Sequence, residues 1–226
     1  MAAHAKTTVL ARIRSEGVIP VFYHGDIEVT REVAKRLVAG GLSTFEFTNR
    51  GDGAIGVFAE LVPWARRELP TLVIGLGSVV ERETAAHAID IGADFVFAPS
   101  LSAGVSAVCN SRNVPYVPGC GTVTEIQAAY ALGCDMVKLF PAGSLGGPAF
   151  LSAVRAPCPW VQAVPTGGVE PTVDSMRAWF EVGAPAVGMG SSLLSKQMVA
   201  DHDWEGIEQR TADTVGAVKA ARGGGR

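Results

Sequence analysis

Short apolar segments recur along the whole chain, and helix-length amphipathic segments separate them. The apolar segments are mostly about four to six residues long and do not alternate between polar and apolar positions. Strands that are buried on both faces have this pattern, which is typical of parallel sheets. The predicted strands are Val18–Tyr23, Thr44–Thr48, Thr71–Leu76, Phe95–Ala98, Tyr116–Pro118, Met136–Phe140, Val161–Val164 and Ala186–Met189.

The intervening segments have a period of about 3.6 residues, which predicts helices that pack on the sheet by one apolar face. The segment Ile27–Ala39 has this pattern and follows the N-cap candidate Asp26. In Thr122–Leu132, Glu125 stands three residues after the first residue, which is the spacing of a capping box. A third helix is predicted over Thr172–Val182.

Strands that alternate with helices along the whole chain predict an α/β fold, namely a parallel eight-stranded (β/α)8 TIM barrel. The length of 226 residues suits one such domain better than two ordinary domains. An open doubly wound sheet is the competing fold, but the dinucleotide-binding pattern GxGxxG is absent from the sequence.

The ends of the chain differ from the repeating part. Within a single domain over residues 1–226, we expect the barrel to span about residues 18–195. An N-terminal helix at about residues 8–16 is expected to cover one end of the barrel, and a C-terminal helix is expected at about residues 203–221. Residues 222–226 are mostly glycine and are predicted to form a disordered tail.

Composition and charge argue against several classes of protein. Hydrophobic residues make up 48% of the chain and charged residues 18%, which favours a large core over disorder. The net charge of −3 and the absence of a basic block argue against a nucleic-acid partner. The apolar segments are too short to span a membrane, and the first residues lack the apolar core of a signal peptide.

The cysteines and histidines do not indicate a metal site or disulfides. None of the four cysteines belongs to a CxxC pair, and an apolar chain of this length does not need disulfides. A reduced, cytoplasmic location is the simpler interpretation. The four histidines form no HxH or HxxxH pair, so we expect neither a metal nor another cofactor.

Lys138 is the strongest candidate for chemistry because it interrupts the otherwise apolar segment Met136–Phe140. The other four lysines lie near the termini, on a helix or after the last predicted strand. Removing an ammonium group from water favours its neutral form, and a neutral amine is what imine formation with a ketone requires. A structural lysine that reaches the barrel mouth or pairs with a carboxylate is the alternative.

Two further charged residues belong to one predicted strand and its end. Glu46 interrupts the apolar run Phe45–Thr48, and a carboxyl group in a water-poor pocket can transfer protons. Its alternative role is that of an ion-pair partner for a buried base, including Lys138. Arg50 follows two residues after the strand and can bind a carboxylate with two hydrogen bonds, although an ordinary surface arginine is the competing interpretation.

Glycine pairs mark the ends of the last two predicted strands. Gly167 and Gly168 follow one strand, and Gly190 and Ser191 follow the other. In TIM barrels the loops after strands 7 and 8 often bind phosphate through backbone N–H groups. Plain turn formation is the alternative for each pair alone. Ser78, at the end of another strand, is a possible hydroxyl donor that could instead bond to its own backbone.

Together these motifs resemble one family, the 2-keto-3-deoxy-6-phosphogluconate (KDPG) aldolases, also called 4-hydroxy-2-oxoglutarate (KHG) aldolases. The resemblance runs from about Val18 to Leu194, and the motifs occur in the family's order. They are Phe45-Glu-Phe-Thr-Asn-Arg50, Gly75-Leu-Gly-Ser-Val79, Lys138-Leu-Phe-Pro141, Pro165-Thr-Gly-Gly168 and Gly190-Ser191. The sequence departs from many relatives at Asn49 and Gly51–Gly53, and in the flexible run Gly143–Gly147.

The resemblance implies a role for each matching position. Lys138 matches the lysine that forms a Schiff base with the keto acid, and Glu46 matches the carboxylate that moves protons during catalysis. The remaining matches concern substrate binding: Arg50 and Ser78 near the pyruvate carboxylate, Pro99 and Phe140 as apolar walls, and Gly167, Gly168, Gly190 and Ser191 at the phosphate. The resemblance also implies a homotrimer.

The function that the resemblance implies is that of a class I aldolase, a lyase that cleaves KDPG into pyruvate and glyceraldehyde 3-phosphate. Its partners would be a small 2-keto acid and an aldehyde phosphate. The galactonate analogue and 4-hydroxy-2-oxoglutarate are alternative substrates. A sugar-phosphate epimerase would share the glycine loops but use clustered His and Asp in its metal-dependent members, and a non-catalytic phosphate-binding barrel would need neither Lys138 nor Glu46.

Overall fold

Parallel strands and helices alternate along the chain in the computed structural model, which describes residues 2–223. The strands are β1 (Val18–Phe22), β2 (Thr44–Thr48), β3 (Val73–Gly77), β4 (Phe95–Phe97), β5 (Tyr116–Val117), β6 (Gly119–Cys120), β7 (Val137–Leu139), β8 (Ala163–Pro165) and β9 (Val187–Met189). The helices are α1 (Lys6–Glu16), α2 (Ile27–Ala39), α3 (Ala54–Glu68), α4 (Arg82–Ile91), α5 (Ala103–Ser111), α6 (Val123–Ala131), α7 (Pro148–Arg155), α8 (Val173–Glu181), α9 (Lys196–Ala200) and α10 (Trp204–Gly223).

The strands form two parallel sheets. One sheet has six strands in the order β5-β4-β3-β2-β1-β9, and the other has three in the order β6-β7-β8. Pro118 alone separates β5 from β6 along the chain, and a parallel bridge joins Thr166, after β8, to Gly188 of β9. The predicted parallel α/β fold is confirmed. Closure of these strands into one eight-stranded barrel stays a prediction.

Each predicted apolar segment overlaps a strand, with ends that differ by at most two residues. The number of strands differs only around Pro118, where one short strand was predicted and the structure has both β5 and β6. Proline lacks the N–H group that a sheet ladder requires, so the regular pairing is interrupted there.

Local capping explains where two helices begin. The Asp26 side chain accepts a hydrogen bond of 2.8 Å from the N–H of Glu28 at the start of α2. At α6, the Thr122 hydroxyl accepts from the N–H of Glu125 at 3.2 Å, and the Glu125 carboxylate accepts from the N–H of Gly121 at 2.8 Å. Both starts were predicted from the sequence, and these contacts satisfy N–H groups that have no partner within the helix.

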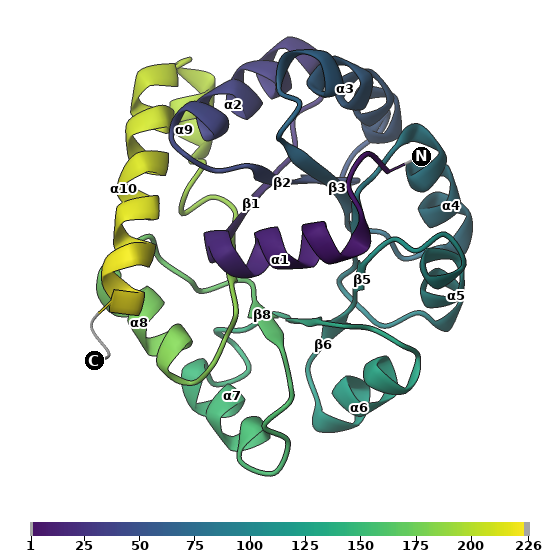
Figure 1. Cartoon of the computed structure of the whole chain (residues 1–226). Coiled ribbons are helices and arrows are strands. Elements are labelled where there is room, and N and C mark those ends of the chain that lie inside the picture. Colours follow the sequence, from purple (N-terminus) through teal and green to yellow (C-terminus); the bar gives the residue numbers. More distant parts are fainter. Residues whose placement is uncertain (1, 224–226) are drawn as a thin grey trace.

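The helices lie outside the strands, whereas α1 crosses in front of them (Figure 1). Its buried residues Val9, Leu10 and Ile13 belong to an apolar cluster that we call the inner cluster. The strands supply the rest of the inner cluster, namely Ile19, Val73, Phe95, Phe97, Val117, Val164 and the flanking residues Met136 and Ala186. The predicted N-terminal helix therefore does cover one end of the strands, and it starts at Lys6.

A buried carboxylate ties the first residues to the strands. Asp94, which is fully buried, accepts hydrogen bonds from the N–H groups of Ala3 and His4. Its second oxygen accepts from the N–H of Ile74 at 3.0 Å and from the Arg66 guanidinium at 2.8 Å. The four donors compensate for the burial of the charge and hold residues 3 and 4 beside α1.

The C-terminal helix is longer than the sequence suggested. α10 continues to Gly223, so residues 222 and 223 are helical rather than part of a tail. The Arg222 guanidinium donates to the carbonyl oxygens of Arg14, Ser15 and Pro185, which holds this last turn in place. The rest of the predicted tail, 224–226, lies outside the described residues.

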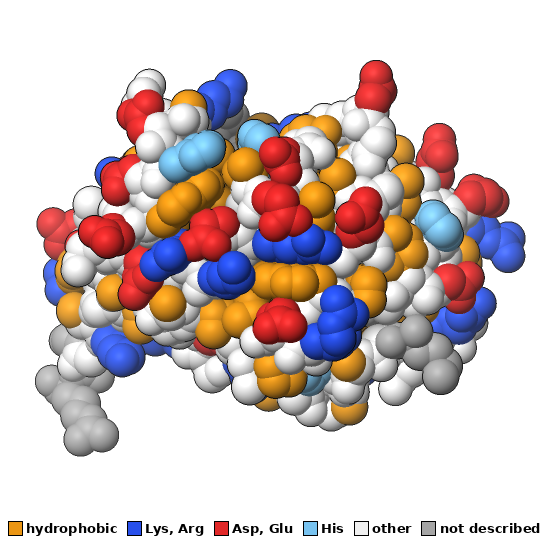
Figure 2. Space-filling view, turned by 90° about the horizontal axis from the view of Figure 1, so that it is seen from above, with side chains coloured by type: hydrophobic (Ala, Val, Ile, Leu, Met, Phe, Trp, Pro, Cys, Tyr) orange, Lys and Arg blue, Asp and Glu red, His pale blue; other side chains and the backbone are white. Residues whose placement is uncertain are grey.

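The surface visible in Figure 2 carries acidic and basic side chains interspersed among hydrophobic and polar ones. This face therefore has no large area of a single charge. Within residues 2–223, none of the helices has the length and apolar character that crossing a membrane requires.

Candidate active site

Lys138 and Glu46 meet in the interior of the fold. Lys138 lies on β7 and Glu46 on β2, and the Lys138 Nζ atom is 3.6 Å from the Glu46 Oε1 atom. Their residues are only 6% and 1% exposed. The Nζ atom also lies 5.7 Å from the ring centroid of Phe97 and 5.4 Å from that of Phe140. The amine therefore has a carboxyl group and two aromatic rings as neighbours in a water-poor space.

The Glu46 carboxyl group is buried without the hydrogen bonds that usually accompany such burial. Among the described residues, neither of its oxygens has a hydrogen-bond partner. Burial raises the pKa of Glu46 above its ordinary value, and the nearby charges of Lys138 and Arg50 oppose this shift without cancelling it. A carboxyl group with a raised pKa holds a proton at higher pH and can donate it to a reacting atom.

Gly77, at the end of β3, leaves the space that the Glu46 side chain occupies. A Cβ atom at Gly77 would lie 2.0 Å from the Glu46 Oε1 atom, which is far inside van der Waals contact. The β2 and β3 strands are in parallel register, with Thr48 opposite Gly77, so the carboxyl group extends toward the strand end. Glycine is thus required here for room rather than for an unusual backbone angle.

A cavity of about 790 Å³ opens next to this pair, at the same end of the strands. Six of the residues predicted to bind substrate line it, namely Arg50, Phe140, Gly167, Gly168, Gly190 and Ser191. Lys138 and Glu46 stand two residues before Phe140 and Thr48, which both line the cavity. Alternate residues of a strand face the same side, so the amine and the carboxyl group lie just beneath the cavity lining.

The glycine turns present backbone donors to the cavity. Gly167 and Gly168 both have positive φ, of 87° and 80°, and a Cβ atom at Gly168 would lie 3.0 Å from Gly143 Cα. Within residues 2–223, the N–H groups of Gly167, Gly168, Gly190 and Ser191 donate to no backbone carbonyl. Free N–H groups on adjacent turns are a common means of binding an anion such as phosphate.

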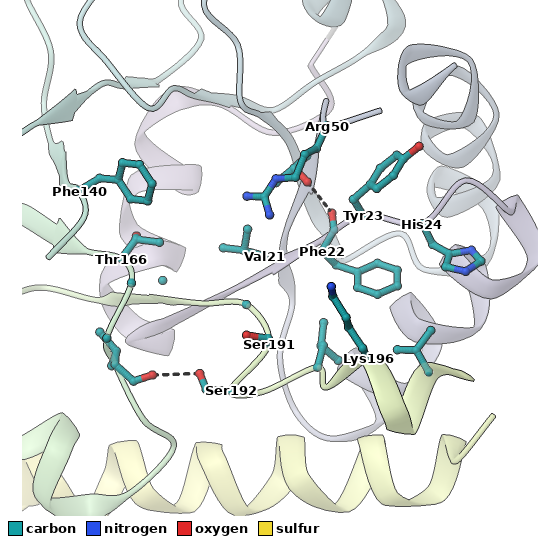
Figure 3. Close-up of a pocket in the computed structure, with 18 of the residues that line it drawn as sticks. Val21, Phe22, Tyr23, His24, Arg50, Phe140, Thr166, Ser191, Ser192 and Lys196 are labelled. Carbon is teal, nitrogen blue, oxygen red and sulfur yellow. Dashed lines mark hydrogen bonds between the residues drawn. The ribbon is translucent and has the colours of Figure 1, made fainter. Parts of the chain in front are cut away.

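Several cavity residues were not singled out from the sequence. They are Tyr23, His24, Thr48, Thr166, Glu170 and Lys196, of which most are labelled in Figure 3. Thr166 belongs to a quoted glycine motif, and its buried hydroxyl has no hydrogen-bond partner among the described residues. Lys196 was recognised only as following the last strand. In the sequence, each of these two residues is a polar residue close to a glycine turn. The direction in which its side chain points could not be predicted from that pattern.

Two predicted substrate-binding residues do not line the cavity. Ser78 follows β3 with a positive φ of 60°, and Pro99 follows β4 on the surface. The Pro99 carbonyl oxygen instead packs against Gly119, where a Cβ atom would lie 2.0 Å away. The substrate-binding roles of Ser78 and Pro99 stay predictions.

The described residues contain no group of three or more His, Cys, Asp or Glu side chains arranged to hold a metal ion.

Comparisons with known proteins agree on one family. A family model described as KDPG and KHG aldolase matches residues 9–210. The 2-dehydro-3-deoxy-phosphogluconate aldolase of Treponema pallidum (strain Nichols) is 32% identical over 214 residues, covering 93% of this chain and 99% of that protein. The KHG/KDPG aldolase of Escherichia coli (strain K12) is 27% identical, covering 95% of this chain and 98% of that protein.

Solved structures show the same likeness. A KDPG aldolase from Legionella pneumophila, with pyruvate captured as a covalent carbinolamine intermediate, superposes with a TM-score of 0.82. It is 26% identical, and the match covers 90% of this chain and 96% of that one. A KDPG aldolase of Zymomonas mobilis ZM4 with 3-phosphoglycerate gives a TM-score of 0.79 at 26% identity, with 93% of this chain and 96% of that one covered.

Proposed function

The chain belongs to the KDPG and KHG aldolase family, and we propose that it is a class I aldolase that cleaves KDPG into pyruvate and glyceraldehyde 3-phosphate through a Schiff base on Lys138. The observation that carries this proposal is the buried Lys138 amine, 3.6 Å from the Glu46 carboxyl group and directly beneath a cavity. The pyruvate carbinolamine of the Legionella pneumophila relative supports the same covalent chemistry.

Lys138 acts as the nucleophile. Its neutral amine adds to the C2 carbonyl of the substrate to give a carbinolamine, and loss of water gives a protonated imine. This cation accepts the electron pair of the C3–C4 bond once a base removes the proton of the C4 hydroxyl. The bond then breaks, glyceraldehyde 3-phosphate leaves, and the enamine of pyruvate remains on Lys138.

Glu46 transfers protons at the same centre. Its carboxyl group protonates C3 of the enamine, directly or through water, and the resulting imine is hydrolysed to release pyruvate. The raised pKa of Glu46 supports this role, because burial keeps a proton available at a pH where an exposed glutamate has lost its own. The closeness of Glu46 to the Lys138 amine also supports proton transfer during carbinolamine formation and dehydration.

The cavity orients the two ends of the substrate. Arg50 binds the carboxylate next to the C2 ketone, and its position in the cavity lining and its charge near the Glu46 carboxyl group support this role. The glycine turns 167–168 and 190–191 bind the phosphate, and their free N–H groups in the cavity lining support this role. Phe140 forms an apolar wall above the amine, and Ser78 and Pro99 are retained as further candidates from the family resemblance.

We also propose that the two sheets form one closed eight-stranded barrel in a single domain, if β5 and β6 are counted as one strand. The Thr166–Gly188 bridge and the single residue between β5 and β6 support this interpretation. The homotrimer that the family resemblance implies stays a prediction, which sedimentation or light scattering would test.

Trapping with borohydride tests the proposed function. Incubation with pyruvate and borohydride should attach a reduced pyruvate imine to Lys138, detectable by peptide mass spectrometry. The Lys138→Met variant should not be labelled, and unchanged labelling of that variant would refute the assignment. A pyruvate-release assay coupled to lactate dehydrogenase, run with KDPG, its galactonate analogue and 4-hydroxy-2-oxoglutarate, identifies the preferred substrate.

A further inference from the structure

The cavity has one arginine and one lysine among its described lining residues, and they belong to different segments. Arg50 follows β2, and Lys196 is the first residue of α9. Glu170 is the single acidic side chain in the same lining, so the cavity carries an excess of one positive charge in a chain whose net charge is −3. Figure 3 shows Arg50 and Lys196 extending toward the interior of the cavity from opposite sides.

The two cations enter the cavity from different segments of the chain. The charge of Arg50 is close enough to Glu46 to lower the pKa of that carboxyl group against the larger effect of burial, which assigns Arg50 to the reacting end. Lys196 belongs to the segment that leaves β9, five residues after Ser191. Lys196 thus follows the turn whose N–H groups are free for an anion, and it lines the same cavity as that turn.

The segment that carries Lys196 is held firmly. The N–H groups of Leu193 and Leu194 both donate to the carbonyl oxygen of Gly190, at 3.0 and 2.9 Å, and both side chains are buried. The Ser195 hydroxyl caps α9 by accepting from the N–H of Met198 at 3.2 Å, and Val199 packs into the core. The backbone that carries Lys196 is thus held in place, while its side chain is exposed and makes no hydrogen bond or ion pair within the described residues.

Neither cation is neutralised by a carboxylate of the described part of the chain. None of the salt bridges formed within residues 2–223 involves Lys196 or Arg50. By contrast, three of the other lysines, Lys6, Lys35 and Lys138, each lie within 4.0 Å of a carboxylate. Two cations without a carboxylate partner in the lining of one cavity suit an anionic ligand.

We propose that Lys196 binds the phosphate group of the substrate's aldehyde half and thereby selects phosphorylated over unphosphorylated 2-keto-3-deoxy acids. This inference rests on the proposed aldolase function and adds a side-chain cation to the backbone donors of the glycine turns. An ammonium group on a four-carbon stem suits phosphate as a mobile point charge, while the N–H groups fix its oxygens. The competing interpretation is an exposed lysine that contacts solvent or Glu170 and leaves selectivity unchanged.

The test compares Lys196→Ala and Lys196→Arg on two substrates with the same carbon skeleton, KDPG and unphosphorylated 2-keto-3-deoxygluconate. Lys196→Ala should lower kcat/KM for KDPG about tenfold to a hundredfold, the loss expected for one charged hydrogen bond. Its effect on the unphosphorylated substrate should be less than about threefold, and Lys196→Arg should restore most of the KDPG activity. Lys219→Ala, on the exposed face of α10, serves as the matched lysine control.

Equal losses on both substrates, or no loss on either, would overturn the role of Lys196. A binding measurement separates this result from failure of the aldolase proposal itself. Calorimetric titration with glycerol 3-phosphate should give an affinity that falls about tenfold or more in Lys196→Ala, whether or not the chain cleaves KDPG. Absence of borohydride labelling on Lys138 together with retained, Lys196-dependent glycerol 3-phosphate binding would refute the catalytic function alone. Affinity that is equal in both proteins would refute the phosphate contact.

Discussion

Gly77 on β3 faces the Glu46 carboxyl group of β2 so closely that a Cβ atom at Gly77 would lie 2.0 Å from Oε1. We predict that Gly77→Ala displaces this carboxyl group and lowers kcat by about a hundredfold or more, the usual contribution of a positioned acid or base. The coupled pyruvate-release assay measures the loss, and circular dichroism checks that the variant folds. Gly216→Ala is the control, because a Cβ atom there meets nothing within 4 Å and alanine favours the α10 helix. Full activity in Gly77→Ala would contradict the proposed place of Glu46.

The raised pKa of Glu46 makes a prediction about stability and pH. A carboxyl group whose pKa is higher in the folded state binds its proton more tightly there, so folding loses stability as pH rises from about 4.5 toward the raised value. The amide in the Glu46→Gln variant cannot titrate. The unfolding free energy of this variant relative to the natural chain should therefore increase with pH over that window, as measured by urea denaturation.

The charge of Lys138 lowers the pKa of Glu46 and so limits this effect. Lys138→Met can be introduced into the natural chain and into the Glu46→Gln variant. The difference in unfolding free energy between these two proteins should then depend on pH more strongly than it does with Lys138 present. A difference that is independent of pH with either residue at position 138 would show that Glu46 keeps its ordinary pKa after folding.

Much of this site was predictable because its chemistry interrupts a local pattern. Lys138 and Glu46 are charged residues inside apolar strands, and parallel strands bring their ends to one edge, so both positions and their meeting were foreseeable. The direction of a side chain on a loop depends on contacts made by residues far away in sequence. The cavity-facing side chain of Lys196 was missed for that reason.

The fold was predicted to a similar extent. Strand cores follow from hydrophobicity, whereas the interruption at Pro118 and the continuation of α10 to Gly223 depend on a missing N–H group and on three hydrogen bonds from Arg222. The role of Asp94 was also missed, because an acidic residue just before a strand ordinarily marks a turn and its four donors come from separate segments.

Asp94 should be one of the most sensitive positions for stability. Asp94→Ala removes a fully buried acceptor and leaves the Arg66 guanidinium and three N–H groups without their partner. We expect a loss of about 3–5 kcal/mol in the free energy of unfolding, as for other broken buried pairs. Chemical denaturation measures it, with Asp174→Ala, whose side chain is 95% exposed, as the control. Equal stability of the two variants would contradict the role of Asp94.

Thiol labelling tests the interior in another way. Burial raises the pKa of Cys109 and of Cys120 to about 12. At about pH 8, roughly one thiol in ten thousand would be ionised, so iodoacetamide should leave both cysteines unmodified in the folded protein. In urea all four cysteines should react, and peptide mass spectrometry distinguishes the sites. Rapid labelling of either residue without urea would show that its strand or helix opens readily.

The inner cluster links the beginning of the chain to the reacting amine. Val9, Leu10 and Ile13 of α1 share that cluster with Phe97, whose ring lies 5.7 Å from the Lys138 Nζ atom. The first helix thus shields the side of the site below the Lys138 amine from water, although it lies far from the lysine in sequence. Removing α1, or pulling it away with a bulky fusion at the amino end, would let water reach the amine from below and weaken catalysis without altering any residue that touches the substrate.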